Sequence, residues 1–165
     1  MTQPTLRTAC LRCGSHAVRP VQRPARSVSY RVFSALPLPA DLPIPTCSRC
    51  HAECLDLETT ERLHQVLPCI YEAELRRLAG QEIRALSPYV SQRRLELLVG
   101  LAQGYLSRLL AQAGNPSSAL VLLLGLIAKD PQARLDEVQA YWRAPRPEPP
   151  LLAALRLATD PLNDS

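Results

Sequence analysis

Aromatic residues are scarce in this sequence. Phe, Trp and Tyr make up only 4% of the 165 residues, whereas proline occurs 16 times. So few bulky side chains exclude the large core of a big enzyme, and a small domain built from them needs a further stabilising element. The length suits one domain or two small ones.

Long apolar segments are also missing. No apolar run reaches the length of about 18 residues that a membrane-spanning helix needs, because the stretch 119–128 ends at Lys129. The N-terminal residues include Arg7, Arg12 and Arg19 and lack the apolar centre of a secretory signal. We therefore expect a cytoplasmic protein without membrane contact, whose thiols stay reduced and free to bind a metal.

Acidic residues are absent before Asp41. The net charge is +4, and six arginines precede that residue: Arg7, Arg12, Arg19, Arg23, Arg26 and Arg31. Because the guanidinium group binds phosphate or carboxylate in a bidentate way, this block permits an anionic partner. Every basic residue except Lys129 is arginine, and a GC-rich coding sequence accounts for that choice more simply than function does.

Composition divides the chain into four parts, and the expected fold class is α+β, mostly α. The first part is rich in Pro, Arg and Cys, and Val28, Tyr30 and Val32 alternate there with other side chains, as in short strands. The later parts show a helical apolar period and then a Pro-rich segment. The parts are a zinc ribbon at 1–56, a linking helix at 57–80, a five-helix domain at 81–142 and a flexible tail at 143–165.

Proline, glycine and serine residues predict where the helices begin and end. Pro68 should bend or interrupt the first helix, Gly80 should end it, and Ser91 should cap a later one. The expected helices are 57–79, 81–86, 92–99, 103–112, 118–129 and 131–142.

Two CxxC pairs are the most specific motif: Cys10 with Cys13, and Cys47 with Cys50. A tetrahedral Zn²⁺ ion takes soft ligands at about 2.3 Å, and each CxxC turn offers it two thiolates. Gly14 permits the tight turn after the first pair. Four thiolates leave no open position, so we expect one structural zinc ion. The alternative of redox motifs fits less well, because neither pair lies at a strand-to-helix junction.

The remaining cysteines and histidines lack such spacing. His51 or Cys54 is an alternative ligand in place of one of the four, although Cys54 and Cys69 are more simply explained as small buried residues. No Ser-His-Asp, P-loop or HExxH arrangement is present, so we expect no enzymatic activity.

Residues 91–108 have the length and the Gly-containing turn of a helix-turn-helix. Leucines at 95, 98, 106 and 109 fall on the inward faces. Arg108 can bind a guanine edge or a phosphate, and Gln103 an adenine edge or a backbone oxygen. The alternative is a pair of packed helices whose polar residues are merely solvated. The outward residues are Gln103, Gly104, Ser107 and Arg108, and Gln92 suits a phosphate contact at its helix N-terminus.

Residues 81–130 resemble the Cro/CI (XRE-type) helix-turn-helix domain, including Asn115, Pro116 and Ser117, which open its fourth helix. The span 10–142 resembles the MqsA-type (YgiT-type zinc finger) antitoxin family in domain order and in both motifs. This resemblance implies a zinc domain that binds a toxin, and a C-terminal domain that dimerises and represses its own operon. It implies DNA contacts from Gly104 and Arg108, with Gln103, Tyr105 and Ser107 beside them.

Four features depart from the pattern of that family. Glu96 replaces a small packed residue, and Leu110 replaces a common Glu. Ala102 replaces the Ser or Thr that caps the second helix, a change worth about 1 kcal/mol, and the turn 87–90 is less polar than usual. A buried carboxylate at position 96 costs several kcal/mol unless it finds a partner or turns outward.

The sequence therefore favours a transcriptional repressor that binds double-stranded operator DNA as a homodimer, an antitoxin by resemblance. One recognition helix reads too few base pairs alone, and the apolar run 120–127 suits a subunit interface, or else a fully buried central helix. The alternative function is a partner-binding adaptor whose degenerate helix-turn-helix no longer binds DNA. A third is an RNA-binding zinc ribbon, which the shortage of stacking aromatics disfavours.

Overall fold

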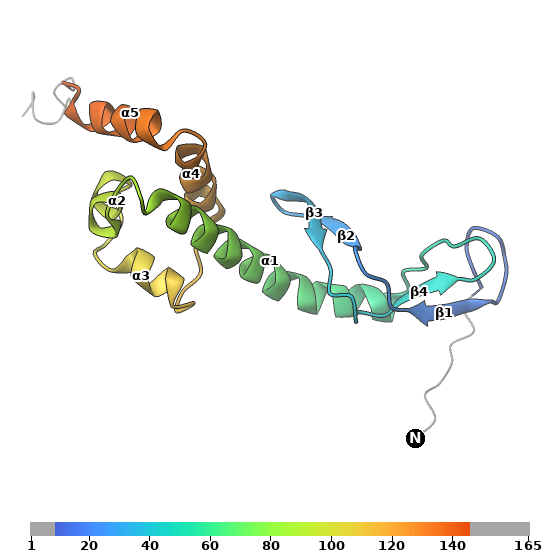
Figure 1. Ribbon diagram of the computed structural model, residues 1–165. Coiled ribbons are helices and arrows are strands. Elements are labelled where there is room, and N and C mark those ends of the chain that lie inside the picture. Colours follow the sequence, from blue (N-terminus) through green and yellow to red (C-terminus); the bar gives the residue numbers. More distant parts are fainter. Residues whose placement is uncertain (1–8, 146–165) are drawn as a thin grey trace, which may run out of the picture.

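The computed structural model describes residues 9–145 and has an α+β architecture (Figure 1). The described part contains two small antiparallel sheets and five helices. The elements are β1 (Val18–Val21), β2 (Ser27–Tyr30), β3 (Phe33–Pro37), β4 (Ile44–Cys47), α1 (Leu57–Leu86), α2 (Gln92–Leu98), α3 (Tyr105–Leu110), α4 (Ser118–Ala128) and α5 (Pro131–Arg143). Two of the strands, β2 and β3, lie beside the N-terminal part of the longest helix, and β1 and β4 lie beyond its N-terminal end (Figure 1). The other helices lie toward its C-terminal end.

Each sheet consists of two strands. β1 pairs with β4, so that Val18 lies opposite Cys47. β2 pairs with β3, with an irregularity between Val28 and Tyr30. Two-stranded sheets are marginally stable alone, so packing on α1 and the cysteine cluster described below have to support them.

The hairpin between β2 and β3 turns at Arg31 and Val32. Arg31 has a φ of 51°, in the left-handed region, and Val32 is 63% exposed. The alternating segment therefore forms two short strands joined by a turn. Phe33 begins β3 and packs edge-on against Tyr71 of α1, with ring centroids 5.6 Å apart. A continuous strand would carry that ring away from the helix.

Helix α1 begins where the sequence predicts. Asp56 is its N-cap, and the Thr59 amide donates a hydrogen bond of 2.8 Å to the Asp56 carboxylate. This bond satisfies one of the amides that a helix leaves unpaired in its first turn.

The predicted interruptions of α1 do not occur: Pro68 and Gly80 both lie inside one helix of 30 residues. A proline there removes one hydrogen bond, and a glycine costs about 1 kcal/mol relative to alanine. Burial of apolar side chains along the whole helix outweighs both costs. The buried apolar residues are Leu63, Leu67, Tyr71, Leu75, Ala79, Ile83 and Leu86.

The shorter helices begin at polar caps, with one exception. Ser91, Ser117 and Asp130 accept hydrogen bonds at the starts of α2, α4 and α5. Helix α3 has no side-chain bond from its own N-cap, Gly104, which has a φ of 77°. The expected helix 103–112 is therefore too long at both ends, since Gln112 also has a positive φ, 58°.

Two apolar clusters form the core, and α1 contributes to both. The first joins the N-terminal half of α1 to β3 and to Ile44 of β4. The second joins its C-terminal half to α2, α3, α4 and Leu135 of α5. Val121 of α4 packs against both clusters. The long helix is thus a shared support for the strands and the helices.

Helix α4 is only half buried. Leu120, Leu124 and Ile127 are buried, whereas Leu122 is 64% exposed and Leu126 is 45% exposed. The alternative of a fully buried central helix is therefore wrong for the single chain. Among the described helices, none is both long enough and apolar enough to pass through a membrane. The part of the predicted tail from residue 146 onward lies outside the described residues.

Candidate functional site

The two CxxC pairs come together at one end of the strands. The sulfur atoms of Cys10, Cys13, Cys47 and Cys50 all lie within 4.8 Å of one another. The Cys10 and Cys50 sulfurs are 3.5 Å apart, and those of Cys13 and Cys47 are 3.7 Å apart. A zinc ion with four thiolates at about 2.3 Å needs sulfur separations of about 3.8 Å. The cluster is therefore compatible with a tetrahedral metal site.

Each pair forms the same kind of turn. The amide of Gly14 donates to the Cys10 carbonyl at 2.8 Å, and the amide of His51 donates to the Cys47 carbonyl at 2.9 Å. Gly14 and His51 have φ values of 69° and 58°, so both are left-handed. His51 therefore occupies the position that Gly14 occupies in the first turn. This role of His51 was not predicted.

Backbone amides prepare some of these thiols for a metal. The Arg12 amide is the main cause that lowers the pKa of Cys10 to about 6, against the opposing effect of burial. The pKa of Cys47 is also lowered, first by the backbone amide of Cys50. The Ala52 amide lowers the pKa of Cys50, but burial and the neighbouring thiols together raise it to about 11. Because metals bind thiolates, the Cys50 proton has to leave when a metal binds.

The other candidate ligands lie outside the cluster. Neither His51 nor Cys54 belongs to the group of close ligand atoms. Cys54 lies near it, since burial and then a hydrogen bond with Cys10 raise its pKa. Cys69 is exposed on α1, so the expectation that it is buried is wrong. Its position in the long helix, facing away from both apolar clusters, explains the exposure.

Arg26 and Arg31 in the N-terminal block have partners. Arg26 is buried, lies 3.0 Å from the Glu53 carboxylate and donates to the Thr46 hydroxyl at 3.2 Å. Arg31 lies over the ring of Tyr71, 4.9 Å from its centroid. The N-terminal block therefore offers an anion fewer free arginines than its sequence indicates. Arg12, Arg19 and Arg23 remain exposed, and Arg7 lies outside the described residues.

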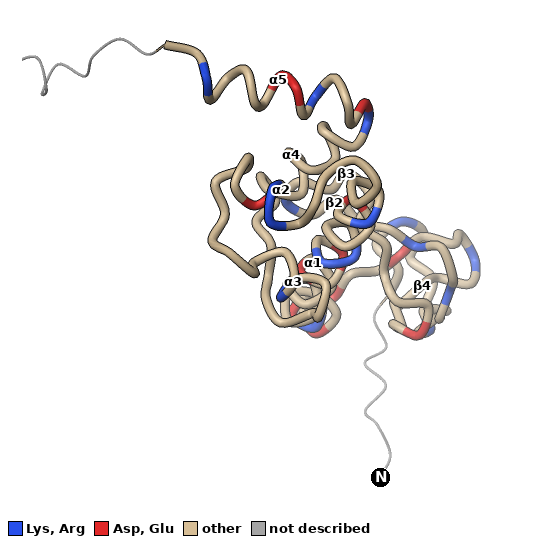
Figure 2. The backbone as a smooth tube through the Cα atoms, turned by 60° about the vertical axis from the view of Figure 1, so that its left-hand side comes forward, with Lys and Arg blue, Asp and Glu red and all other residues tan. Residues whose placement is uncertain are grey.

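The candidate DNA-contacting residues lie on and beside α2 and α3. The Ser107 hydroxyl donates to the Gln92 side chain at 2.9 Å, which joins the two helices. The Arg108 guanidinium lies 5.8 Å from the centre of the Tyr105 ring. Gln103 is exposed in the turn before α3. Figure 2 shows where basic and acidic residues lie along the chain, including the basic residues of α2 and α3.

Glu96 is the unexpected residue of this region. It is 3% exposed, and its two carboxylate oxygens accept hydrogen bonds from the amides of Gly104 and Leu106, at 2.9 and 2.8 Å. Its carboxylate thus caps the start of α3 from within α2, because the N-cap residue Gly104 has no side chain to do so. No sequence pattern marks this contact, because the burial of Glu96 and the missing side-chain cap of α3 are both properties of the fold.

Comparisons of the chain with protein-family models, curated proteins and solved structures found no match.

Proposed function

We propose that this protein is a transcriptional repressor that binds double-stranded DNA through a helix-turn-helix formed by α2 and α3. The main observation that supports this proposal is the charge around these two helices. Between Glu82 and Asp130 the only acidic residue is Glu96, and its carboxylate is buried on backbone amides. Arg93, Arg94 and Arg108 are exposed in the same region. Such a segment attracts a phosphate backbone, since it carries exposed arginines and no exposed acid of its own.

The proposed contacts divide into reading and positioning. Arg108 and Gln103 are exposed and polar, which suits base edges or phosphates. The bond between Ser107 and Gln92 holds the start of α2 against α3, so that both helices meet the backbone together. Within the proposal, the Glu96 carboxylate fixes the direction in which α3 leaves the turn.

The cysteine cluster is proposed to hold a structural zinc ion, so that the N-terminal part forms a zinc ribbon. Four thiolates fill a tetrahedral shell and leave no position for water or substrate, and the ion stabilises a segment with little apolar core. Metal analysis of Cys47→Ser tests this, with Cys69→Ser as the control because Cys69 is exposed and outside the cluster. Loss of zinc in the first variant alone is expected. Full zinc content in Cys47→Ser would contradict the site.

The proposed repressor is a homodimer that uses the exposed side of α4. Leu122 and Leu126 remain in contact with water in the single chain, and covering them removes apolar surface from solvent. A two-fold dimer also doubles the length of DNA that is read. Whether the protein is also an antitoxin depends on a toxin partner, which the family resemblance alone suggests.

A mobility-shift experiment with the DNA upstream of its own gene tests the proposal. Zinc-loaded protein is measured at two salt concentrations, beside Arg108→Ala and the control Arg62→Ala, whose arginine lies on α1 and pairs with Glu58. We expect binding that weakens steeply with salt, and a loss of roughly 1–3 kcal/mol in Arg108→Ala only. Absence of binding at low salt would overturn the proposal and favour the adaptor.

A further inference from the structure

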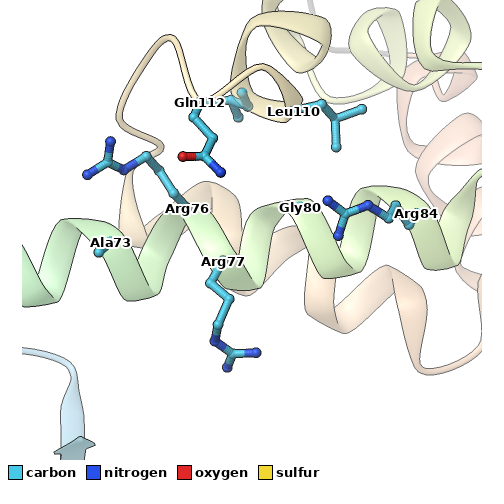
Figure 3. A pocket seen from close by; sticks show the side chains of 8 residues that line it. Ala73, Arg76, Arg77, Gly80, Arg84, Leu110 and Gln112 are labelled. Atoms are coloured by element: carbon cyan, nitrogen blue, oxygen red, sulfur yellow. The ribbon is translucent and has the colours of Figure 1, made fainter. Parts of the chain in front are cut away.

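A cavity of about 270 Å³ lies between α1 and the end of α3 (Figure 3). Arginines of α1 line one wall, and Leu109, Leu110 and Gln112 line the other. Figure 3 shows Arg76 and Arg84 on the side of α1 that faces Gln112 and Leu110, whereas Arg77 extends from the opposite side. No acidic side chain is among the residues that line the cavity.

The charges of Arg76 and Arg84 are not neutralised within residues 9–145. Neither side chain forms an ion pair there, and the only side-chain bond of Arg76 goes to the backbone carbonyl of Glu72. Arg77 differs, because its Nε and Nη2 both donate to the Glu74 carboxylate at 2.8 Å, and this contact raises its pKa. The cavity therefore presents two unpaired cations together with the amide of Gln112.

The spacing of the two arginines defines what fits between them. They lie eight residues apart on one helix, which at 1.5 Å per residue places their Cα atoms about 12 Å apart. Arg84 folds back over Gly80, so that a Cβ at position 80 would lie only 3.6 Å from its guanidinium. Arg76 and Arg84 therefore start about two helical turns apart along the cavity, and this spacing suits a ligand with several anionic groups in series.

We propose that this cavity binds consecutive phosphate groups, with Arg76 and Arg84 as their ligands and Gln112 as an additional donor. Guanidinium groups bind phosphate oxygens in a bidentate way, and an arginine keeps its charge at any physiological pH. The phosphate groups can come from two sources. The first is the backbone of bound DNA, because the cavity adjoins α3, and for this source the inference rests on the proposed function. The second source is a free polyphosphate, such as that of a nucleoside triphosphate.

The first arm of the test contains no DNA. Binding of tripolyphosphate to the full zinc-loaded chain is measured by calorimetry at constant ionic strength. The double variant Arg76→Gln/Arg84→Gln is compared with Arg19→Gln/Arg23→Gln, which removes the same charge from exposed positions near β1. We expect at least a tenfold loss of affinity in the first variant and none in the second. Gln112→Glu, which adds an opposing charge at an exposed position, should also weaken binding.

The second arm measures DNA affinity against salt concentration. If the DNA backbone fills the cavity, the double variant at Arg76 and Arg84 lowers the salt slope by about 1 for each lost phosphate contact. If only free polyphosphate fills it, that slope is unchanged while the first arm is positive. Two results together overturn the proposal. The first is that tripolyphosphate binds no better than chloride, or binds the double variant as well as the unchanged protein. The second is that the salt slope of DNA binding is also unchanged in the double variant. If the protein binds no DNA at all, only the proposed function is contradicted, because the first arm still tests phosphate binding in the cavity.

Discussion

Individual residues in this protein acquire their roles from the backbone groups around them. Glu96 is destabilising by type in a buried position, yet two backbone amides at the start of α3 turn its carboxylate into a cap. His51 stands where the matching turn uses Gly14, and its left-handed backbone makes it a turn residue outside the group of four close cysteine sulfurs. Residue type predicted neither role, because both depend on which backbone groups lie nearby.

Removal of the buried carboxylate should destabilise the protein measurably. Glu96→Ala leaves the Gly104 and Leu106 amides without an acceptor, and bonds to charged groups are worth roughly 1.5–3 kcal/mol each. We expect a loss of about that size or more in urea unfolding. Glu61→Ala, at an exposed position of α1, is the control and should change stability by less than about 0.5 kcal/mol. Equal stability of both variants would show that the cap is dispensable.

The lengths of the helices depend on the local backbone conformation and on packing against the core. α3 is short because Gly104 and Gln112, on either side of it, are left-handed. α1 is long because it packs apolar residues against two separate clusters along its length. The boundary at Gly80 was mispredicted for this reason: the glycine signal is local, whereas the burial of Ala79 and Ile83 on either side is not.

The cap of α1 should make stability depend on pH. The Thr59 hydroxyl and then the Thr59 amide lower the pKa of Asp56 below its ordinary 3.8. A carboxyl with a depressed folded pKa stabilises the fold above its unfolded pKa, and this contribution is lost as pH falls through the folded value. Asp56→Ala should therefore cost about 1 kcal/mol at neutral pH and clearly less at a pH well below the folded pKa. A cost that is equal at both pH values would remove the carboxylate from the capping role.

Glycines inside and outside helices should respond oppositely to alanine. Gly80 lies within α1, and an added Cβ meets only the Arg84 side chain, at 3.6 Å or more. Gly80→Ala should therefore raise the free energy of unfolding by about 0.5–1 kcal/mol. Gly104→Ala, at a φ of 77°, should lower it by about 1 kcal/mol or more. Chemical denaturation of the two variants measures both signs, and a destabilised Gly80→Ala would contradict the first.

At the scale of the whole molecule, one helix connects two parts with different sources of stability. The strand end has the cysteine cluster and a modest apolar cluster, whereas the helical end has a larger apolar cluster that contains no cysteine. A metal held by the cysteine cluster would therefore stabilise one end of the described chain, and apolar packing the other.

Metal removal should affect these two ends unequally. After chelation, we expect amide exchange to become fast in β1 and β4, since the turn of one metal-binding pair follows β4 directly. α4 and Leu135 of α5 should keep their protection, because their apolar cluster begins only at Ala79. Hydrogen exchange followed residue by residue measures this. Loss of protection in α4 as well would show a single cooperative unit.

The sequence by itself determined the chemistry that local spacing encodes. The CxxC pairs predicted which four sulfurs come together, and Ser91, Asp56 and Ser117 lie where serine and aspartate cap helices. Such signals depend on a few neighbouring residues, so they can be recognised without knowledge of the fold. Only the tertiary structure decided the continuity of α1, the partners of Glu96, the pairing of Arg26 with Glu53 and the exposure of Cys69. These features arise from burial and from contacts between distant segments, which no local pattern records.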